Sequence, residues 1–476
     1  MTNTNNNTPA NETTREDIPL KSGTKLSKWY HCNEECLGGS RFINAAFGTL
    51  TVIITIALLI QIYYGDYQVV PHGSVATDNI ECSHIGTQIL KKGGNARDAA
   101  IASAFCLSVV AQHLTSLDAE GQIMIYNHRK RDLPIVIDFS SPNVLSDKMP
   151  KLVVGLAYIH KLYGSMSWKS LVEPSVQIAR RGHKISNGFL KAMDQAKAHA
   201  LFGRIDPDKP LKNENLAITL ETIANITEKE LYGYIDPAHQ PIQMQAIKSS
   251  FHNYDVFVPA SETIGSVLLV NLREIEEYNF TKVNTEAVKR ILDSTLKTYN
   301  EFKVTSRFHE GTSTNIAVMD MEDNYVSLVI GLYELFGSGE LTSHGYVLDV
   351  KNKEKSCSRI PIILTDNKFI CGKRMAFGAN GIAQGSQIVS NLVIGDKNVT
   401  DGIEAPRFYV LDGNTVAVEV SHTPKFSIEI LRHLNETHTK SEVKPEPYYS
   451  SNVVAKYQDD LSSHSDSRGE GVASRF

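Results

Sequence analysis

The longest apolar run in the chain lies close to its start. Residues Asn44–Tyr64 read NAAFGTLTVIITIALLIQIYY and contain no charged side chain. A helix of this length crosses a hydrocarbon core of about 30 Å. Tyr63 and Tyr64 lie where interfacial aromatic residues are common. The pattern therefore predicts a transmembrane signal anchor at residues 44–64.

The charges on either side of this run predict its orientation. Basic residues precede it (Lys21, Lys25, Lys28 and Arg41), whereas the next one after it is Lys91. Because basic flanks stay in the cytoplasm, we expect a single-pass type II membrane protein. Residues 1–43 form a disordered cytoplasmic tail in this interpretation, and everything after the anchor is extracellular or luminal.

A buried core helix and a cleaved signal peptide both fit this run less well than an anchor does. A buried core helix would lie inside a domain, but this run adjoins a polar tail. A cleaved signal peptide would have a shorter apolar stretch that starts earlier and ends at a small-residue cleavage site.

After the anchor, the apolar positions follow two periods. Helical spacing predicts helices within Glu81–His113, interrupted at Gly93 and Gly94, and within Leu152–Arg181, interrupted at Gly164 with Pro174 near a helix start. Residues 187–300 are typical of amphipathic helices and loops. Alternating spacing predicts strands at Gln122–Tyr126, Leu133–Phe139, Thr314–Met321, Tyr325–Leu332, Gly345–Val350, Ile360–Leu364 and Thr415–Val420. Such blocks of helices and antiparallel strands indicate α+β layers rather than a doubly wound sheet.

Composition and charge narrow the classes of function. A net charge of -5 without a basic stripe gives no reason to expect nucleic acid as a partner. Of the six cysteines, any that form a disulfide should come from those after the anchor, with the pairing left open: Cys82, Cys106, Cys357 and Cys371. His31, Cys32 and Cys36 lack a fourth ligand, so we expect solvated or lipidated thiols rather than a metal site.

Glycosylation sequons support the predicted topology weakly, because they also arise by chance. Those after the anchor begin at Asn225, Asn279, Asn398 and Asn435. The two before it, at Asn6 and Asn11, should stay unmodified.

A series of motifs resembles the gamma-glutamyltransferase (glutathione hydrolase) family. They occur in the family's order, and the junction QIYYGDYQVV at Gln61–Val70 is most similar to the glutathione hydrolase 7 branch. The first two motifs are the GG-x-A-x-D-A-A-I-A helix within Asp78–Val110 and the G-x-x-x-W-x-x-L-x-x-P helices within Gly164–Gly182. The later ones are Gly311–Ser313, Phe336–Ser338, Gly378–Gly381, Glu404–Arg407 and Ser465–Gly469.

The resemblance implies an N-terminal-nucleophile hydrolase fold, a four-layer αββα sandwich following the transmembrane helix. It also implies self-cleavage between Gly311 and Thr312. The products would be a heavy-subunit region of residues 65–311 and a light-subunit region of residues 312–476, which stay associated. The substrate implied is glutathione or another gamma-glutamyl compound, and no cofactor or metal is implied.

The chemistry expected of Thr312 follows from its becoming a chain end. A hydroxyl is a poor nucleophile until a base removes its proton, and a new α-amine with a pKa of about 8 serves as that base. Gly311 has no Cβ, so its backbone can adopt the strained geometry of an N-to-O acyl shift. By resemblance, Gly381 and Ile382 provide oxyanion-binding N–H groups from a loop, and Ser358 helps to bind substrate and oxyanion.

Several segments that recognise substrate in the family differ here. The family's V-I-D-x-R-E arginine is replaced by Ser140, and serine cannot form a bidentate cationic contact. The glycine-rich loop reads Ser116–Gly121, with Glu120 inside it, and the S-T-I-N segment reads Ile330–Tyr333. The acidic loop reads Asp349–Lys353. We therefore weigh an active gamma-glutamyl enzyme against a catalytically impaired binding or scaffold protein, with an unrelated adhesion ectodomain as a third hypothesis.

Overall fold

The protein is described here from a computed structural model. It describes residues 34–64, 71–140, 149–203, 205–235, 237–260, 263–351, 353–395, 397–412, 415–436 and 440–476. The chain divides into two units, residues 1–68 and 69–476.

The first unit contains the apolar helix α1 (Glu34–Tyr64). Its segment Arg41–Tyr63 is long and apolar enough to cross a membrane, and none of it is buried in the protein. The helix begins at Glu34 rather than at Asn44, so residues 34–43, which we expected within the disordered tail, are helical. The rest of the predicted tail, including His31 and Cys32, lies outside the described residues, as does the side chain of Cys36.

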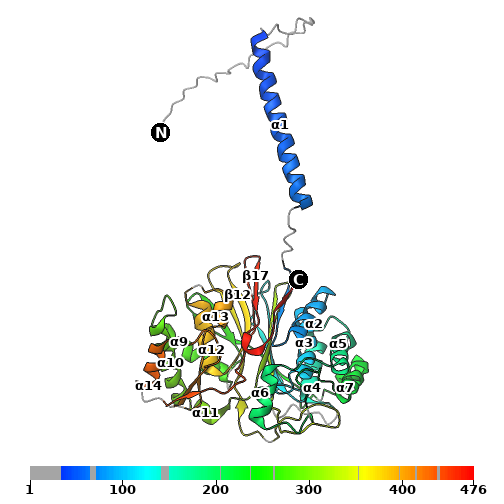
Figure 1. Cartoon of the computed structure of the whole chain (residues 1–476), viewed down its shortest axis with the longest axis vertical. Helices are drawn as coiled ribbons and strands as arrows, with labels where there is room; N and C mark the ends of the chain where they lie inside the picture. The colour runs from blue at the N-terminus through cyan, green and yellow to red at the C-terminus, as the bar shows by residue number, and fades with distance from the viewer. Residues whose placement is uncertain are drawn as a thin grey trace, which may run out of the picture. The chain divides into compact units, whose positions relative to one another are not determined.

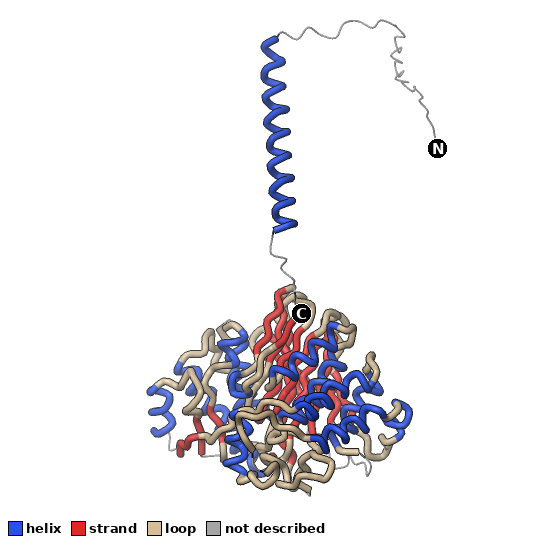
Figure 2. Tube along the Cα trace, turned by 45° about the vertical axis from the view of Figure 1, so that its right-hand side comes forward, coloured by secondary structure: helices blue, strands red, loops and turns tan. Residues whose placement is uncertain are grey.

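The second unit is built on two mainly antiparallel sheets (Figure 2). The seven-stranded sheet runs in the order β18 (Ser474–Arg475), β1 (Ser74–Ala76), β8 (Thr314–Met319), β9 (Asn324–Gly331), β2 (Glu120–Asn127), β3 (Ile135–Asp138) and β4 (Ile242–Gln245). The six-stranded sheet runs in the order β17 (Asp460–His464), β16 (Val453–Tyr457), β12 (Arg374–Asn380), β11 (Arg359–Asp366), β6 (Tyr254–Val258) and β5 (Ile247–Phe251).

The two sheets pack face to face through buried side chains that alternate along their strands, among them Met124, Tyr325, Ile363 and Ala376. Two smaller sheets flank them. One pairs β7 (Phe308–His309) with β10 (Ser356–Cys357), and the other contains β13 (Phe408–Val410), β14 (Thr415–Val418) and β15 (Lys440–Val443).

Helices cover the outer face of each sheet (Figure 1). The seven-stranded sheet is covered by α2 (Ile80–Lys91), α3 (Ala96–Val110), α4 (Lys151–Tyr163), α5 (Trp168–Arg181), α7 (Glu214–Asn225) and α8 (Glu228–Gly233). The six-stranded sheet is covered by α9 (Ile264–Glu276), α10 (Thr285–Glu301) and α12 (Gly381–Val393). These layers confirm the predicted four-layer αββα sandwich.

The remaining short helices lie around these layers: α6 (Asn187–Ala196), α11 (Val304–Arg307), α13 (Val399–Ile403), α14 (Ile428–Glu436) and the 3-10 turn η1 (Ser467–Gly469).

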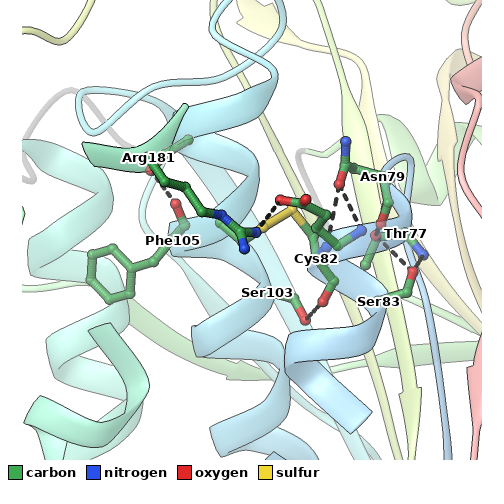
Figure 3. Close-up of a disulfide and its surroundings, with 10 residues drawn as sticks. Thr77, Asn79, Cys82, Ser83, Ser103, Phe105 and Arg181 are labelled. Atoms are coloured by element: carbon green, nitrogen blue, oxygen red, sulfur yellow. Dashed lines mark hydrogen bonds and ion pairs between the residues drawn. A yellow bond between two sulfur atoms is a disulfide. The ribbon is translucent and has the colours of Figure 1, made fainter. Parts of the chain in front are cut away.

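A disulfide joins the first two helices of the outer layer (Figure 3). Cys82 of α2 and Cys106 of α3 form it, and both side chains are fully buried. Ser103 donates a hydrogen bond to the carbonyl of Cys82 beside it, at 3.0 Å. The expectation that a disulfide forms among the cysteines after the anchor is confirmed, and Cys357 and Cys371 are free thiols.

Residues 187–300 are mostly helix and loop, as expected, and also contain the short strands β4, β5 and β6; partly exposed strands such as β4 lack a clean alternation. Two other local predictions were wrong. Gly345–Val350 is no strand, since its pairing is limited to the single bridge Leu341–Val347. Pro174 lies inside α5 rather than near its start, because packing of the helix's apolar face outweighs the lost backbone hydrogen bond.

Candidate active site

Thr312 lies two residues before the start of β8, at one end of the larger sheet. Its amide donates to the Leu332 carbonyl at 3.0 Å. This hydrogen bond extends the pairing of β8 with β9 beyond their last pair, Thr314 and Ile330. The residue is 3% exposed. Tertiary pairing on both sides of β8 therefore fixes the position of this threonine.

The Thr312 hydroxyl is surrounded by backbone groups. Its Oγ1 lies 2.7 Å from the Leu114 carbonyl and 2.9 Å from the Leu332 carbonyl, and it accepts from the Leu332 amide at 2.9 Å. One hydroxyl proton serves one of the two carbonyls at a time. Among the described residues, the hydrogen-bond partners that hold this side chain are therefore main-chain groups.

Gly311 has a backbone conformation that favours glycine. In the structure it is joined to Thr312 and has φ +67°, a region in which a side chain is strained. A Cβ there would also lie 3.0 Å from Cys357 Sγ. The Gly311 carbonyl accepts a hydrogen bond from the Tyr449 hydroxyl at 3.0 Å. Burial, and next the charge of Glu310, hold the pKa of Tyr449 well above its usual value, so this hydroxyl stays a donor.

A cavity of about 400 Å³ opens beside this peptide bond. Gly311 and Thr312 line it together with His309, Glu310, Glu334, Lys444 and Tyr449.

Ser358 and Gly381 line a second cavity of about 260 Å³. His309 of β7 and Glu310 line both cavities. In the uncut chain this segment therefore lies between Thr312 and the predicted oxyanion residues Ser358 and Gly381. The Gly381 amide donates to the Ser358 carbonyl at 2.6 Å, and the Ser358 amide donates to the His309 carbonyl at 2.9 Å.

The glycine-containing segment Gly378–Gly381 is not the loop that we expected. Gly378 lies in β12, and Gly381 is the first residue of α12, followed by the fully buried Ile382. Tertiary pairing of β12 with β11 and β16 keeps these small residues extended.

Two of the segments that differ from the family's motifs, Ser116–Gly121 and Asp349–Lys353, meet in one charge cluster with little exposure to solvent. We define this buried charge cluster as Glu120, Lys151, Asp349, Lys353 and Arg359. Glu120 bridges Lys151 at 2.9 Å, Lys353 at 2.7 Å and Arg359 at 3.6 Å. Lys353 also bridges Asp349 at 2.5 Å. Burial alone would raise the pKa of Glu120, but the three cations outweigh it and lower that pKa.

Arg359 connects this charge cluster to the threonine. Its Nε donates to the Thr312 carbonyl at 2.9 Å and its Nη2 to the Leu332 carbonyl at 2.5 Å. Gly331 makes room for it, since a Cβ at Gly331 would lie 2.1 Å from the Thr312 carbonyl oxygen and 2.9 Å from Arg359 Nε. Glu120, Gly331 and Arg359 are therefore mutually compatible.

Ser140, which replaces the family's arginine, turns toward its own strand. Its amide donates to Asp138 at 2.8 Å and its hydroxyl also bonds to that carboxylate. Burial raises the pKa of Asp138. Ser140 adds no positive charge at this end of β3.

The sequon residues lie at the surface wherever their side chains are described. Asn225 and Asn279 are exposed, and Asn398 is exposed while capping α13. Asn435 lies in α14, but its side chain is not among those described. Their glycosylation stays a prediction.

Sequence analysis did not identify Arg359, Lys444 or Tyr449 as site residues. Arg359 follows Ser358 at the start of an apolar strand, and a charge in that position was a usable signal. Lys444 and Tyr449 lie more than 130 residues from Gly311 and gave no local signal. No group of three or more His, Cys, Asp or Glu side chains suited to a metal occurs in the described part of the chain.

Comparison with known proteins agrees with this architecture. The gamma-glutamyltranspeptidase family model matches residues 82–234. Glutathione hydrolase 7 from Homo sapiens is 24% identical, over 83% of this chain and 78% of that protein. The capsule biosynthesis protein CapD proenzyme from Bacillus anthracis is 22% identical, over 84% of this chain and 90% of that protein.

Among solved structures, a cephalosporin acylase from Bacillus halodurans superposes with a TM-score of 0.67 and 18% identity, covering 85% of this chain and 96% of that one. This likeness concerns the fold. The family match over the first helical layer and the similarity to relatives over most of the chain agree with the ordered motifs around Thr312, and together they show that this chain is similar to the gamma-glutamyltranspeptidase family.

Proposed function

We propose that the outer domain is an N-terminal threonine hydrolase that cleaves its own chain between Gly311 and Thr312 and then acts on gamma-glutamyl compounds, by hydrolysing glutathione or transferring its glutamyl group. The observation that carries the proposal is the Gly311–Thr312 peptide bond itself. It borders a cavity, follows a glycine with a positive φ angle and has a hydrogen-bond donor on its carbonyl oxygen.

Self-cleavage begins with attack of the Thr312 Oγ on the Gly311 carbonyl carbon. The C–N bond breaks, an ester forms, and the hydroxyl proton ends on the released amine. Water then hydrolyses the ester and leaves a carboxylate on Gly311. The Tyr449 hydroxyl stabilises the negative charge that develops on the carbonyl oxygen.

The same threonine then acts on substrate. Its free α-amine takes the hydroxyl proton, and the Oγ attacks the gamma-glutamyl carbonyl to form an acyl-enzyme. Water or an acceptor amine releases the glutamyl group. No metal or organic cofactor takes part in these steps.

A second candidate, a catalytically impaired binding or scaffold protein, is favoured by a different observation. The buried charge cluster replaces the family's glycine-rich and acidic loops, and Ser140 adds no cation. A substrate recognised only by the family's arginine would therefore bind weakly.

N-terminal sequencing of the protein purified from membranes separates the candidates. The active enzyme gives a smaller band that starts at Thr312, and Thr312→Ala gives one uncut chain. Cut protein that is inactive on a gamma-glutamyl anilide would support the impaired relative. A wild-type chain that stays uncut would sink the enzyme proposal.

We also propose that α1 anchors the protein as a single-pass type II membrane protein, with the outer domain extracellular or luminal. The apolar segment Arg41–Tyr63 and the basic residues before it support this orientation. Protease added outside intact vesicles of known orientation tests it, since cytoplasmic exposure of the second unit would contradict it.

A further inference from the structure

Lys444 is a buried cation in the same cavity as Thr312. It follows β15, is 8% exposed, and is the one lysine or arginine among the described residues that line this cavity. Its Nζ lies 2.9 Å from each carboxylate oxygen of Glu310. This two-oxygen contact resembles the way a protein cation binds a ligand's carboxylate.

Two aromatic rings complete the surroundings of this cation. Lys444 Nζ lies 4.9 Å from the ring centroids of both Tyr409 and Tyr449. The ring faces stabilise a positive charge that has little contact with water. These residues come from β13 and from the segment after β15, so the tertiary structure holds the ammonium in place independently of Glu310.

Glu310 is more exposed to solvent than its partner. Its side chain is 39% exposed, against 10% for that of Lys444. It lies next to Gly311, on the N-terminal side of the peptide bond that self-cleavage would break. Cleavage removes the covalent tie between Glu310 and β8, whereas Lys444 stays attached to the small sheet beside the cavity.

From this arrangement we infer that Lys444, Tyr409 and Tyr449 form a carboxylate-binding subsite that Glu310 fills in the uncut chain and that the free carboxylate of an acidic acyl donor fills after cleavage. The inference rests on the proposed function. It supplies from the C-terminal part of the chain the positive charge that Ser140 does not provide. The substrate class is an amide donor carrying a free carboxylate near the reacting carbonyl, as in gamma-glutamyl amides.

The subsite can be tested without any catalytic activity, in protein carrying Thr312→Ala. We would add Glu310→Ala to empty the subsite and measure binding of two probes by ligand-observed NMR. L-Glutamine has the free carboxylate, and L-glutaminamide lacks it. We expect the double variant to bind L-glutamine at least about tenfold more tightly than L-glutaminamide, and Thr312→Ala alone to show no such preference.

Two further variants make the result specific. Adding Lys444→Met to the double variant should abolish the preference. Glu334→Ala in place of Glu310→Ala is the matched control: Glu334 lines the same cavity but lies 3.1 Å from His309, and it should create no preference. Equal binding of both probes to the double variant, or a preference that survives Lys444→Met, would overturn the subsite.

Folding is checked by thermal unfolding of every variant. If Glu310→Ala does not fold, Glu310→Gln keeps the side chain's size and removes its charge, and the same preference is expected from it. Absence of the preference in folded Glu310→Gln then counts against the subsite. Because all these chains carry Thr312→Ala, the outcome is independent of whether wild-type protein cuts itself, which N-terminal sequencing decides.

Discussion

At the scale of single residues, main-chain groups hold the Thr312 hydroxyl, and a side chain binds the carbonyl of the peptide bond before Thr312. The Leu114 and Leu332 backbones fix the hydroxyl, and Tyr449 binds the Gly311 carbonyl. Because these partners of the hydroxyl are backbone groups, they persist when neighbouring side chains are replaced.

Tyr449→Phe should slow self-cleavage about a hundredfold, because removing one oxyanion donor costs about that much in rate. The measurement is the ratio of cut to uncut chain over time after synthesis, read on a denaturing gel. Tyr448→Phe is the control. Tyr448 lines the same cavity, but its hydroxyl accepts from the Val420 and Ser421 amides, both at 3.3 Å, and does not contact Gly311. Equal cleavage rates of the two variants would remove Tyr449 from the mechanism.

Within the buried charge cluster, Glu120→Gln should lower the free energy of unfolding by about 3 kcal/mol, because it leaves buried cations without their shared carboxylate. Combining it with Arg359→Met removes one of those cations and should restore part of the loss. Urea unfolding measures the free energy of unfolding of the two single variants and of the double variant. A double variant whose loss equals the sum of the two single losses would show that the two side chains are not coupled.

Buried histidines predict how stability depends on pH. Burial lowers the pKa of His113 to about 3 and that of His183 to about 4. In the unfolded chain these groups titrate near 6.5, so between these values the unfolded state binds more protons and stability falls as pH falls. From pH 7 to pH 5 each should cost about 2 kcal/mol.

His113→Phe should flatten this pH dependence, since its ring packs against Phe189 and Phe336 and needs no charge there. The measurement is the free energy of unfolding in urea at pH 7 and pH 5. A slope that is the same in wild type and variant would show that His113 titrates equally in both states.

At the scale of elements, the disulfide fixes α2 to α3 on the outer face of the larger sheet. Cys82 and Cys106 are separated by 24 positions in the sequence. Closing a loop of that length stabilises a fold by about 3 kcal/mol. Replacing both with alanine should therefore lower the free energy of unfolding by this amount. Cys371→Ser removes an exposed free thiol and should leave the free energy of unfolding unchanged. A comparable loss from it would contradict the assignment of this stabilisation to the disulfide.

At the scale of the whole molecule, the two units differ in what stabilises them. Residues 69–476 contain all of the buried apolar clusters, whereas the apolar side chains of α1 are exposed in the protein. A secreted chain that begins at Val69 should therefore fold with the Tm of the detergent-solubilised full-length protein. Circular dichroism on heating measures this, and a drop of more than about 5 °C would show that the outer domain needs its anchor.

The hydrophobic pattern predicted much of the architecture. The apolar run gave α1, the helical spacing with its glycine interruptions gave α2 to α5, and the alternating spacing gave β8 and β9. The partly exposed β4 and β5 were missed, since their burial is set by partners far away in the chain. Gly378 was placed in a loop because glycine in a strand gives the same local signal as glycine in a turn.

The sequence by itself indicated the similarity to the family, the apolar helix and the candidate threonine, because each is carried by residues that are contiguous or closely spaced. Only the tertiary structure decided what surrounds that threonine. Glu120, Arg359 and the pair Lys444 and Tyr449 come from three separate segments, and their meeting depends on how the two sheets and the small sheets pack. Contacts between distant segments leave no periodic pattern in the sequence, because each such contact involves only one residue from each segment.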